Sequence, residues 1–225
     1  MDTEQVEDVR LVVYRAFASD GAPPSRVDLA RRTGLAPTEV DEALRRLHEH
    51  RDLVLGPDGQ IVMAHPFSAV PLGFSVMGRR TLWWGGCAWD SFAIPHLLPE
   101  EDEVLVATRC PGCGAPHAVV VRRDAPPESD LVAHFLTPVD RVWDDVVRAC
   151  GNQRIFCAET CVTNWLERTR SDRGCVMDLP QLWRLARGWY AGRLDRGYQR
   201  REPSAAAEYF HEVGLRGPFW GLPRA

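Results

Sequence analysis

The chain has 225 residues, a formal net charge of −4 and 45% hydrophobic residues, which suits one medium domain or a small domain joined to a larger one. Its acidic start differs from the basic start of a secretory signal, and no apolar run approaches the roughly 20 residues that span a bilayer. We therefore expect a soluble, cytoplasmic protein without a membrane segment. The seven cysteines are too few and too uneven for a secreted disulfide framework, so they indicate metal or thiol chemistry.

Residues 1–65 are predicted to form a winged helix-turn-helix-like module. Apolar residues at helical spacing predict three helices within roughly the first fifty residues, and Asp58-Gly59 between two apolar runs predicts a hairpin that would be the wing. Over residues 1–52, eight arginines stand against eleven acidic residues, a formal charge of −3. A protein that reads duplex DNA normally has a basic face, so nucleic acid is disfavoured as a partner and a structural or lid role is predicted.

Residues 66–175 are predicted to form a mainly antiparallel sheet with flanking helices, which makes the fold class α+β. Residues 176–225 are predicted to be a C-terminal helical extension, with a helix that begins at Asp178 or Pro180. The apolar pair Phe219-Trp220 in its polar tail is expected to dock onto the core. The expected strands cover 72–76, 80–84, 104–108, 118–121 and 131–136, and further helices are expected over 139–149 and from 158 through 166.

Cys87 and Asp90 stand three residues apart, directly after the Gly85-Gly86 pair and before a segment with helical apolar spacing. This spacing predicts that both side chains lie on one face of the first turn of a helix. Unpaired N–H groups at a helix start favour negative charge, so Cys87 is predicted to ionise readily to a thiolate that binds soft metals. The structural alternative is a buried cysteine beside an aspartate that only complements the helix dipole.

Cys110 and Cys113 form a Cys-Pro-Gly-Cys-Gly turn between two predicted strands, with the spacing of half a tetrahedral zinc site. The second half could come from Cys157 and Cys161, which have three residues between them, or from His117. The alternative is a plain hairpin turn that keeps two reduced thiols, with the later pair as buried residues of a helix.

Two separated cysteine motifs carry a resemblance to a known family. They are Cys87-Ala88-Trp89-Asp90, followed by a helix with Pro95, and Cys150 placed before Ile155-Phe156 and Trp165. Together with the helical N-terminal module and the cysteine hairpin, they resemble the organomercurial lyases, also called alkylmercury lyases. The resemblance covers most of residues 5–170.

What the resemblance implies is protonolysis of a carbon–mercury bond, which releases a hydrocarbon and leaves Hg(II) on the protein. By position, Cys87 and Cys150 would be the two thiolates and Asp90 the proton carrier. These residue types suit the reaction because Hg(II) is soft and prefers sulfur, while the leaving carbanion needs a proton donor within hydrogen-bond reach. The resemblance further implies an organomercurial substrate, no required cofactor, and external thiols or a mercuric reductase as the acceptor of Hg(II).

The surroundings of the motifs lead to three further expectations. Aromatic residues near the first motif are expected to form an apolar wall for the organic group: Trp84, Trp89 and Phe92. Family members often carry a further cysteine directly after the second catalytic one, where this chain has Gly151, so a thiol for metal hand-off would have to come from elsewhere, such as Cys157. Cys157 is also an alternative to Cys150 as the second thiolate, because it too stands near a helix start.

Two other functions stay open on the sequence. One is a thiol-based, metal-sensing winged-helix transcription regulator that binds a soft metal through Cys87, Cys150 and the Cys110 pair, although the acidic N-terminal module disfavours it. The other is a zinc-stabilised, non-enzymatic protein whose cysteines only hold the fold.

Overall fold

The structure is a computed structural model that describes residues 2–223, so residues 1, 224 and 225 of the predicted terminal modules lie outside it. Mixed helices and antiparallel sheets make up the fold, as predicted. The strands are β1 (Val54–Leu55), β2 (Ile61–Ala64), β3 (Phe67–Ser68), β4 (Phe74–Met77), β5 (Leu82–Gly85), β6 (Glu103–Arg109), β7 (Pro116–Arg122), β8 (Val132–Phe135), β9 (Gln153–Phe156) and β10 (Cys175–Asp178). The larger sheet has the strand order β1-β2-β3-β5-β4-β6-β7, and the smaller has the order β10-β8-β9.

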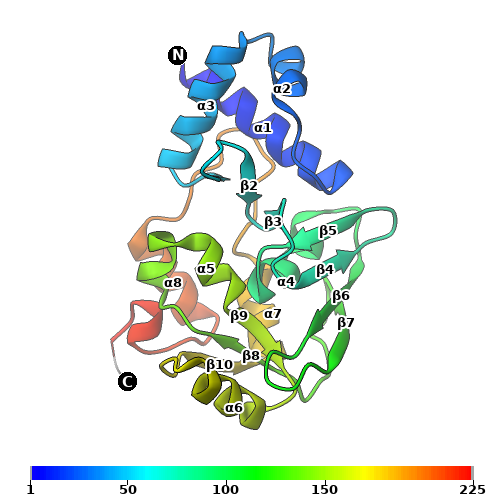
Figure 1. Ribbon diagram of the computed structural model, residues 1–225, viewed down its shortest axis with the longest axis vertical. Helices are drawn as coiled ribbons and strands as arrows, with labels where there is room; N and C mark the ends of the chain where they lie inside the picture. Colours follow the sequence, from blue (N-terminus) through cyan, green and yellow to red (C-terminus); the bar gives the residue numbers. More distant parts are fainter. Residues whose placement is uncertain (1, 224–225) are drawn as a thin grey trace.

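Helix α4 (Ala88–Leu97) is the centre of the molecule and packs against both sheets. Every residue of α4 except His96 is buried, which agrees with a helix that is apolar on all sides. The helix also packs against α7 (Leu179–Arg187), and Figure 1 shows this pair behind the strands. Because α4 has no solvent-exposed face, polar groups at its first turn lie inside the protein.

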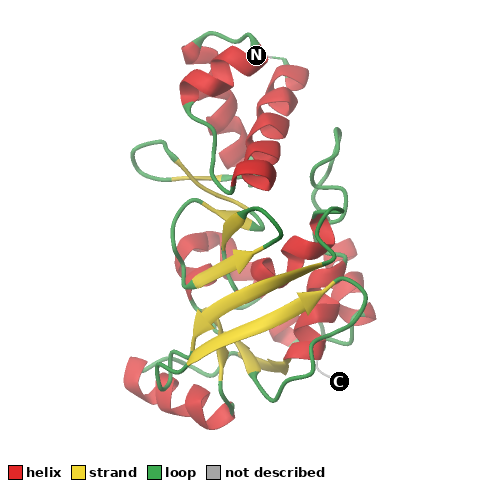
Figure 2. Cartoon of the chain, turned by 90° about the vertical axis from the view of Figure 1, so that its right-hand side faces the viewer, coloured by secondary structure: helices red, strands yellow, loops and turns green. Residues whose placement is uncertain are grey.

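Helices α1 (Thr3–Asp20), α2 (Arg26–Thr33) and α3 (Pro37–Glu49) form one end of the molecule (Figures 1 and 2). Strands β1 and β2 pair as the predicted hairpin, and Gly59 in its turn has a φ of 76°. The ring of Phe17 stacks on Phe67 with centroids 5.8 Å apart, and the Trp83 indole N–H donates to the Phe17 carbonyl. The module therefore shares its core with the sheet. The winged helix-turn-helix description stays a prediction.

The second half of the chain differs from the expectation in one helix and in two strands that were not predicted, β9 and β10. The helix predicted over 139–149 is split into a 3-10 helix, η1 (Val139–Asp144), and α5 (Val146–Gly151). The break occurs because the Asp145 side chain caps α5 by accepting the Arg148 backbone N–H at 3.0 Å. The tail contains a further helix, α8 (Pro203–Glu212), and a short turn of 3-10 helix, η2 (Pro218–Trp220).

Helix α6 (Glu159–Thr169) lies at the end of the molecule opposite the N-terminal helices (Figure 1). The tail docks as expected, because Trp220 is buried and belongs to the main core. Within residues 2–223, none of the helices combines the length and apolar character that crossing a membrane requires.

Candidate active site

Cys87 and Asp90 occupy the predicted positions at the start of α4. Cys87 is the N-cap residue, and its sulfur accepts the Asp90 backbone N–H at 3.4 Å. The Cys87 thiol in turn donates to the Asp90 Oδ2 atom at 3.1 Å, and both side chains are almost fully buried. The preceding glycines make this arrangement possible, since a Cβ at Gly86 would collide with the Asp90 carboxylate and one at Gly85 with the Ser91 hydroxyl.

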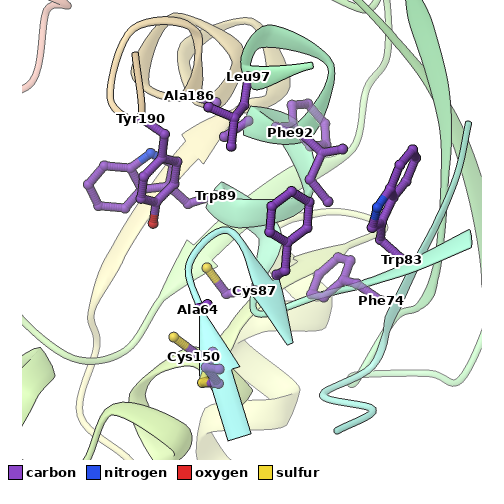
Figure 3. Packing of buried hydrophobic residues seen from close by; sticks show 14 of the residues in the cluster. Ala64, Phe74, Trp83, Cys87, Trp89, Phe92, Leu97, Cys150, Ala186 and Tyr190 are labelled. Carbon is purple, nitrogen blue, oxygen red and sulfur yellow. The ribbon is translucent and has the colours of Figure 1, made fainter. Parts of the chain in front are cut away.

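Cys150 approaches the same carboxylate from a different part of the chain. It lies near the end of α5, is 2% exposed, and has its sulfur 4.0 Å from Asp90 Oδ2. Figure 3 shows Cys87 and Cys150 side by side, next to Trp89 and Tyr190. One carboxylate oxygen therefore lies within reach of both buried thiols.

His65 and Tyr190 complete the polar centre, and sequence reasoning missed both. His65 lies in the corner between β2 and β3, and its Nε2 atom is 3.5 Å from the Cys150 sulfur. Tyr190 follows α7, and its hydroxyl donates to Asp90 Oδ1 at 2.5 Å. Neither residue lies in a recognisable motif, so only the tertiary structure shows that they contact the cysteine–aspartate centre.

The two thiols differ in acidity. Burial raises the pKa of Cys87 well above its usual value, and the neighbouring Cys150 and Asp90 groups raise it further. The prediction that Cys87 ionises readily is therefore wrong, since the N–H groups of the helix start do not compensate for desolvation and for a carboxylate at 3.1 Å. The pKa of Cys150 is lowered, because the neighbouring Cys87 thiol and the contact with His65 stabilise its thiolate against burial.

The imidazole and the phenol respond to the same charges. Burial opposes protonation of His65, but the charge of Asp90 and the contact with Cys150 outweigh it and raise the pKa of the imidazole. The pKa of Tyr190 is raised well above its usual value by burial and by the nearby Asp90, so the phenol keeps its proton and acts as a hydrogen-bond donor. These shifts make Cys150 the more acidic of the two thiols and favour the protonated form of the His65 imidazole beside it.

A cavity of about 950 Å³ opens onto this centre, and both thiols, Asp90 and His65 line it. Further parts of its wall come from the end of α3, from η1, from the segment that follows α7, and from α8 and Trp220. Trp89 and Trp189 give it an apolar side, with ring centroids 4.8 Å apart, and the Trp89 Nε1 atom has no hydrogen-bond partner among residues 2–223. The volume suits a small organic molecule.

Two of the three aromatic residues expected in the cavity wall lie elsewhere. Phe92 is on the other side of α4, where it packs toward Phe74 and Trp83 (Figure 3). Trp84 is 38% exposed on the larger sheet and does not line the cavity. The expectation held for Trp89 alone, since neither Phe92 nor Trp84, which lies on strand β5, lines the cavity.

The remaining cysteines fall outside the cavity. Cys157 lies with Cys110, Cys113 and Cys161 in a second sulfur cluster, which removes it as the alternative to Cys150. In the part of the chain that the structure describes, Cys87 and Cys150 are the only cysteines that line the cavity. A metal ion in the cavity would find four donors in Cys87, Cys150, Asp90 and His65, and the last three have ligand atoms within 4.8 Å of one another.

Comparisons with known proteins identify the fold and the family. A solved structure described as the mercury-bound form of MerB2 matches with a TM-score of 0.61 and 21% identity, over 83% of this chain and 89% of that one, which shows a shared fold. No curated protein matches the chain. The family model for alkylmercury lyases matches residues 67–191, more than half of the 225 residues and the segment that holds both thiols, Asp90 and Tyr190. The chain therefore belongs to the alkylmercury lyase family, the enzymes that cleave carbon–mercury bonds.

Proposed function

We propose that this chain cleaves organomercurials with Cys150 and Cys87 as the mercury ligands and Asp90 as the proton carrier. The observation that carries the proposal is the single oxygen, Asp90 Oδ2, at 3.1 Å from one buried sulfur and 4.0 Å from the other. A carboxylate that only complemented a helix start would not need to lie between two thiols. A carrier that takes a proton from one thiol and delivers it near the metal must lie within hydrogen-bond reach of that thiol.

The first step follows from the different acidities of the two thiols. Cys150 is the readier thiolate, so it displaces the exchangeable ligand of R–Hg–X, and X leaves as an anion. His65, 3.5 Å from the Cys150 sulfur, supplies the positive charge that favours this thiolate in the buried cavity. The organic group then lies against Trp89 and the other apolar residues of the cavity wall.

The proton for the carbon comes from Cys87. As its sulfur approaches mercury, its proton passes to Asp90 Oδ2 along the existing hydrogen bond, and a second thiolate binds the metal. The extra sulfur ligand weakens the carbon–mercury bond, whose electron pair goes to carbon while Asp90 returns the proton there. The products are R–H and Hg(II) held by two thiolates, with no change in oxidation state. The Tyr190 hydroxyl holds the carboxylate in place through its other oxygen.

Product release completes the cycle in this proposal. Since Cys87 and Cys150 are the only cysteines lining the cavity within residues 2–223, no third protein thiol waits there to receive Hg(II). We infer that small external thiols, or the thiols of a mercuric reductase, enter the cavity and take the metal directly. Such an exchange replaces each protein sulfur with another sulfur ligand, so it costs little in metal–ligand energy.

We infer that the N-terminal module is winged-helix-like and serves as a wall of the cavity instead of reading DNA. Residues 49–52, at the end of α3 and directly after it, line the cavity. The buried Arg193 guanidinium joins the module to the site by donating to the Tyr14 hydroxyl at 2.8 Å and the Asp52 carbonyl at 3.2 Å. These contacts fix the module against the site, as a wall of the cavity requires, whereas a DNA-binding domain would not need them.

The test is Asp90→Asn, which keeps the side chain's size and both thiols. Single-turnover release of hydrocarbon should fall by about a hundredfold to ten-thousandfold, while organomercurial binding persists. Asp140→Asn is the matched control, because Asp140 is an exposed aspartate at the cavity wall and should leave release unchanged. Release from Asp90→Asn at the wild-type rate would refute the mechanism, and loss of binding together with release would make Asp90 a ligand instead of the proton carrier.

A further inference from the structure

Four cysteines that the proposed reaction does not use come together beyond the end of β9, whereas Cys150 lies before its start. Cys110 and Cys113 lie in the turn between β6 and β7, Cys157 directly follows β9, and Cys161 is in the first turn of α6. All four sulfur atoms lie within 4.8 Å of one another, and those of Cys113 and Cys157 are 3.4 Å apart. The cluster thus joins two hairpin residues to two residues more than forty positions later.

We propose that these four thiols bind a structural zinc ion. In a tetrahedral zinc–thiolate site the metal–sulfur distance is about 2.3 Å, which places the sulfurs about 3.8 Å from one another. The observed sulfur–sulfur distances run from 3.4 Å to no more than 4.8 Å, on both sides of this value. Small rotations about the Cα–Cβ bonds would therefore bring the four sulfurs into a tetrahedral arrangement. Two ligands with two residues between them, followed by a second pair at a helix start, are also the usual arrangement of structural zinc sites.

The backbone of the turn is held against α6 without help from a metal. A Cβ at Gly112 would lie 2.5 Å from the Cys161 carbonyl oxygen, so only glycine allows this close approach. The Arg168 guanidinium, from the last turn of α6, donates to the Pro111 carbonyl at 2.6 Å and to the Gly112 carbonyl at 3.2 Å. The ligands are therefore already positioned on both sides, which lowers the cost of metal binding.

The charges around the cluster also suit an anionic metal site. Zn²⁺ with four thiolates carries a net charge of −2, which needs nearby positive groups. Three guanidinium groups donate to carbonyls of the turn or of the residue before it: Arg168 as described, Arg109 to Gly114 at 3.2 Å, and Arg154 to Arg109 at 3.3 Å. Four neutral thiols would not need positive charges nearby, whereas a negatively charged metal–thiolate site would be stabilised by the three guanidinium groups at this turn.

A zinc ion would also supply stability where the hydrophobic core is thin. The cluster borders a separate small core made of Cys110, Phe156, Val162, Trp165 and Leu166, which is not continuous with the main core. An ion bound by four thiols would cross-link the β6–β7 hairpin to α6, and such sites contribute directly to folding. The expected consequence of its loss is local opening of α6 instead of loss of the reaction centre.

The test is metal content per chain in protein purified without chelators. We expect one zinc per wild-type chain, retained in a Cys87→Ala/Cys150→Ser variant and in Cys175→Ser, and lost in Cys113→Ser/Cys161→Ser. Zinc that disappears with the active-site pair but stays with the cluster variant would overturn the assignment. So would stoichiometric iron in place of zinc, or folded wild-type protein that contains no metal and takes up no added zinc.

A second measurement keeps the proposal falsifiable if the cluster variant does not fold. Wild-type protein exchanged with Co²⁺ should show thiolate-to-metal charge-transfer absorption and the strong visible bands of tetrahedral coordination. Adding excess Zn²⁺ should abolish both sets of bands, and the Cys87→Ala/Cys150→Ser variant, which lacks the cavity thiols, should show the same bands as the wild type. Weak octahedral bands, or bands that are missing from this cavity variant, would refute a four-thiolate site at this cluster.

Discussion

Replacing His65 with glutamine removes an imidazole 3.5 Å from the Cys150 sulfur, whose protonated form its surroundings favour, and keeps a polar side chain. A hydrogen bond to a charged group contributes about 1.5–3 kcal/mol, and about 1.4 kcal/mol corresponds to one pKa unit. We therefore expect the pKa of the Cys150 thiol to rise in His65→Gln. The neighbouring Cys87 thiol, the larger cause of the lowered pKa, remains in this variant.

The sign of the effect follows from which form of the thiol reacts. The thiolate attacks mercury, so kcat/KM rises with pH until the thiol is ionised, and a raised pKa moves this rise to higher pH. At a fixed pH below the transition, the variant should lose about 10–100-fold in kcat/KM, and the loss should shrink as the pH increases. A purely structural role for His65 would instead lower the rate by the same factor at every pH.

The assay is hydrocarbon release from an organomercurial across a range of pH, with external thiol in excess. His50→Gln is the matched control, because His50 also lines the cavity but has an exposed side chain and should keep the wild-type profile. Thermal unfolding of both variants checks that the fold is intact. An unchanged midpoint of the pH profile in His65→Gln would show that the imidazole does not set the acidity of Cys150.

Three further outcomes test the proposed site and the buried charges. Tyr190→Phe should slow single-turnover hydrocarbon release by about 10–100-fold and leave substrate binding intact, because it removes a charge-assisted hydrogen bond; equal loss of binding would contradict a positioning role. Cys87→Ala and Cys150→Ser should each abolish release, and the double variant should be no worse, because the thiols act as one unit; full activity in either single variant would remove that residue from the mechanism. Burial lowers the pKa of His96 to about 4, so as the pH falls from about 6.5 to 4 the unfolded chain binds a proton that the folded protein does not, and the free energy of unfolding decreases. After allowing for partial exposure of the ring, this loss should be about 1–2 kcal/mol. In His96→Gln the melting temperature should therefore fall less over the same pH range.

Local patterns in the sequence were enough to predict much of this protein. The three-residue spacing of Cys87 and Asp90 after two glycines correctly placed both at the start of a helix, because helix geometry depends only on neighbouring residues. The alternation of apolar residues likewise predicted the antiparallel strands, and Asp58-Gly59 predicted the hairpin. These features depend on interactions within a few residues, so they can be read without knowing the rest of the fold.

The chemistry of the site was decided by tertiary structure. Cys157 stayed open on the sequence as an alternative to Cys150, because it stands near a helix start, and only packing placed Cys150 beside Asp90 and Cys157 in the four-cysteine cluster. His65 and Tyr190 reach Asp90 and its neighbouring thiol from distant parts of the chain. The acidity of Cys87 was predicted with the wrong sign, because desolvation and a buried carboxylate depend on what surrounds a helix start, whereas sequence shows only that the helix starts there.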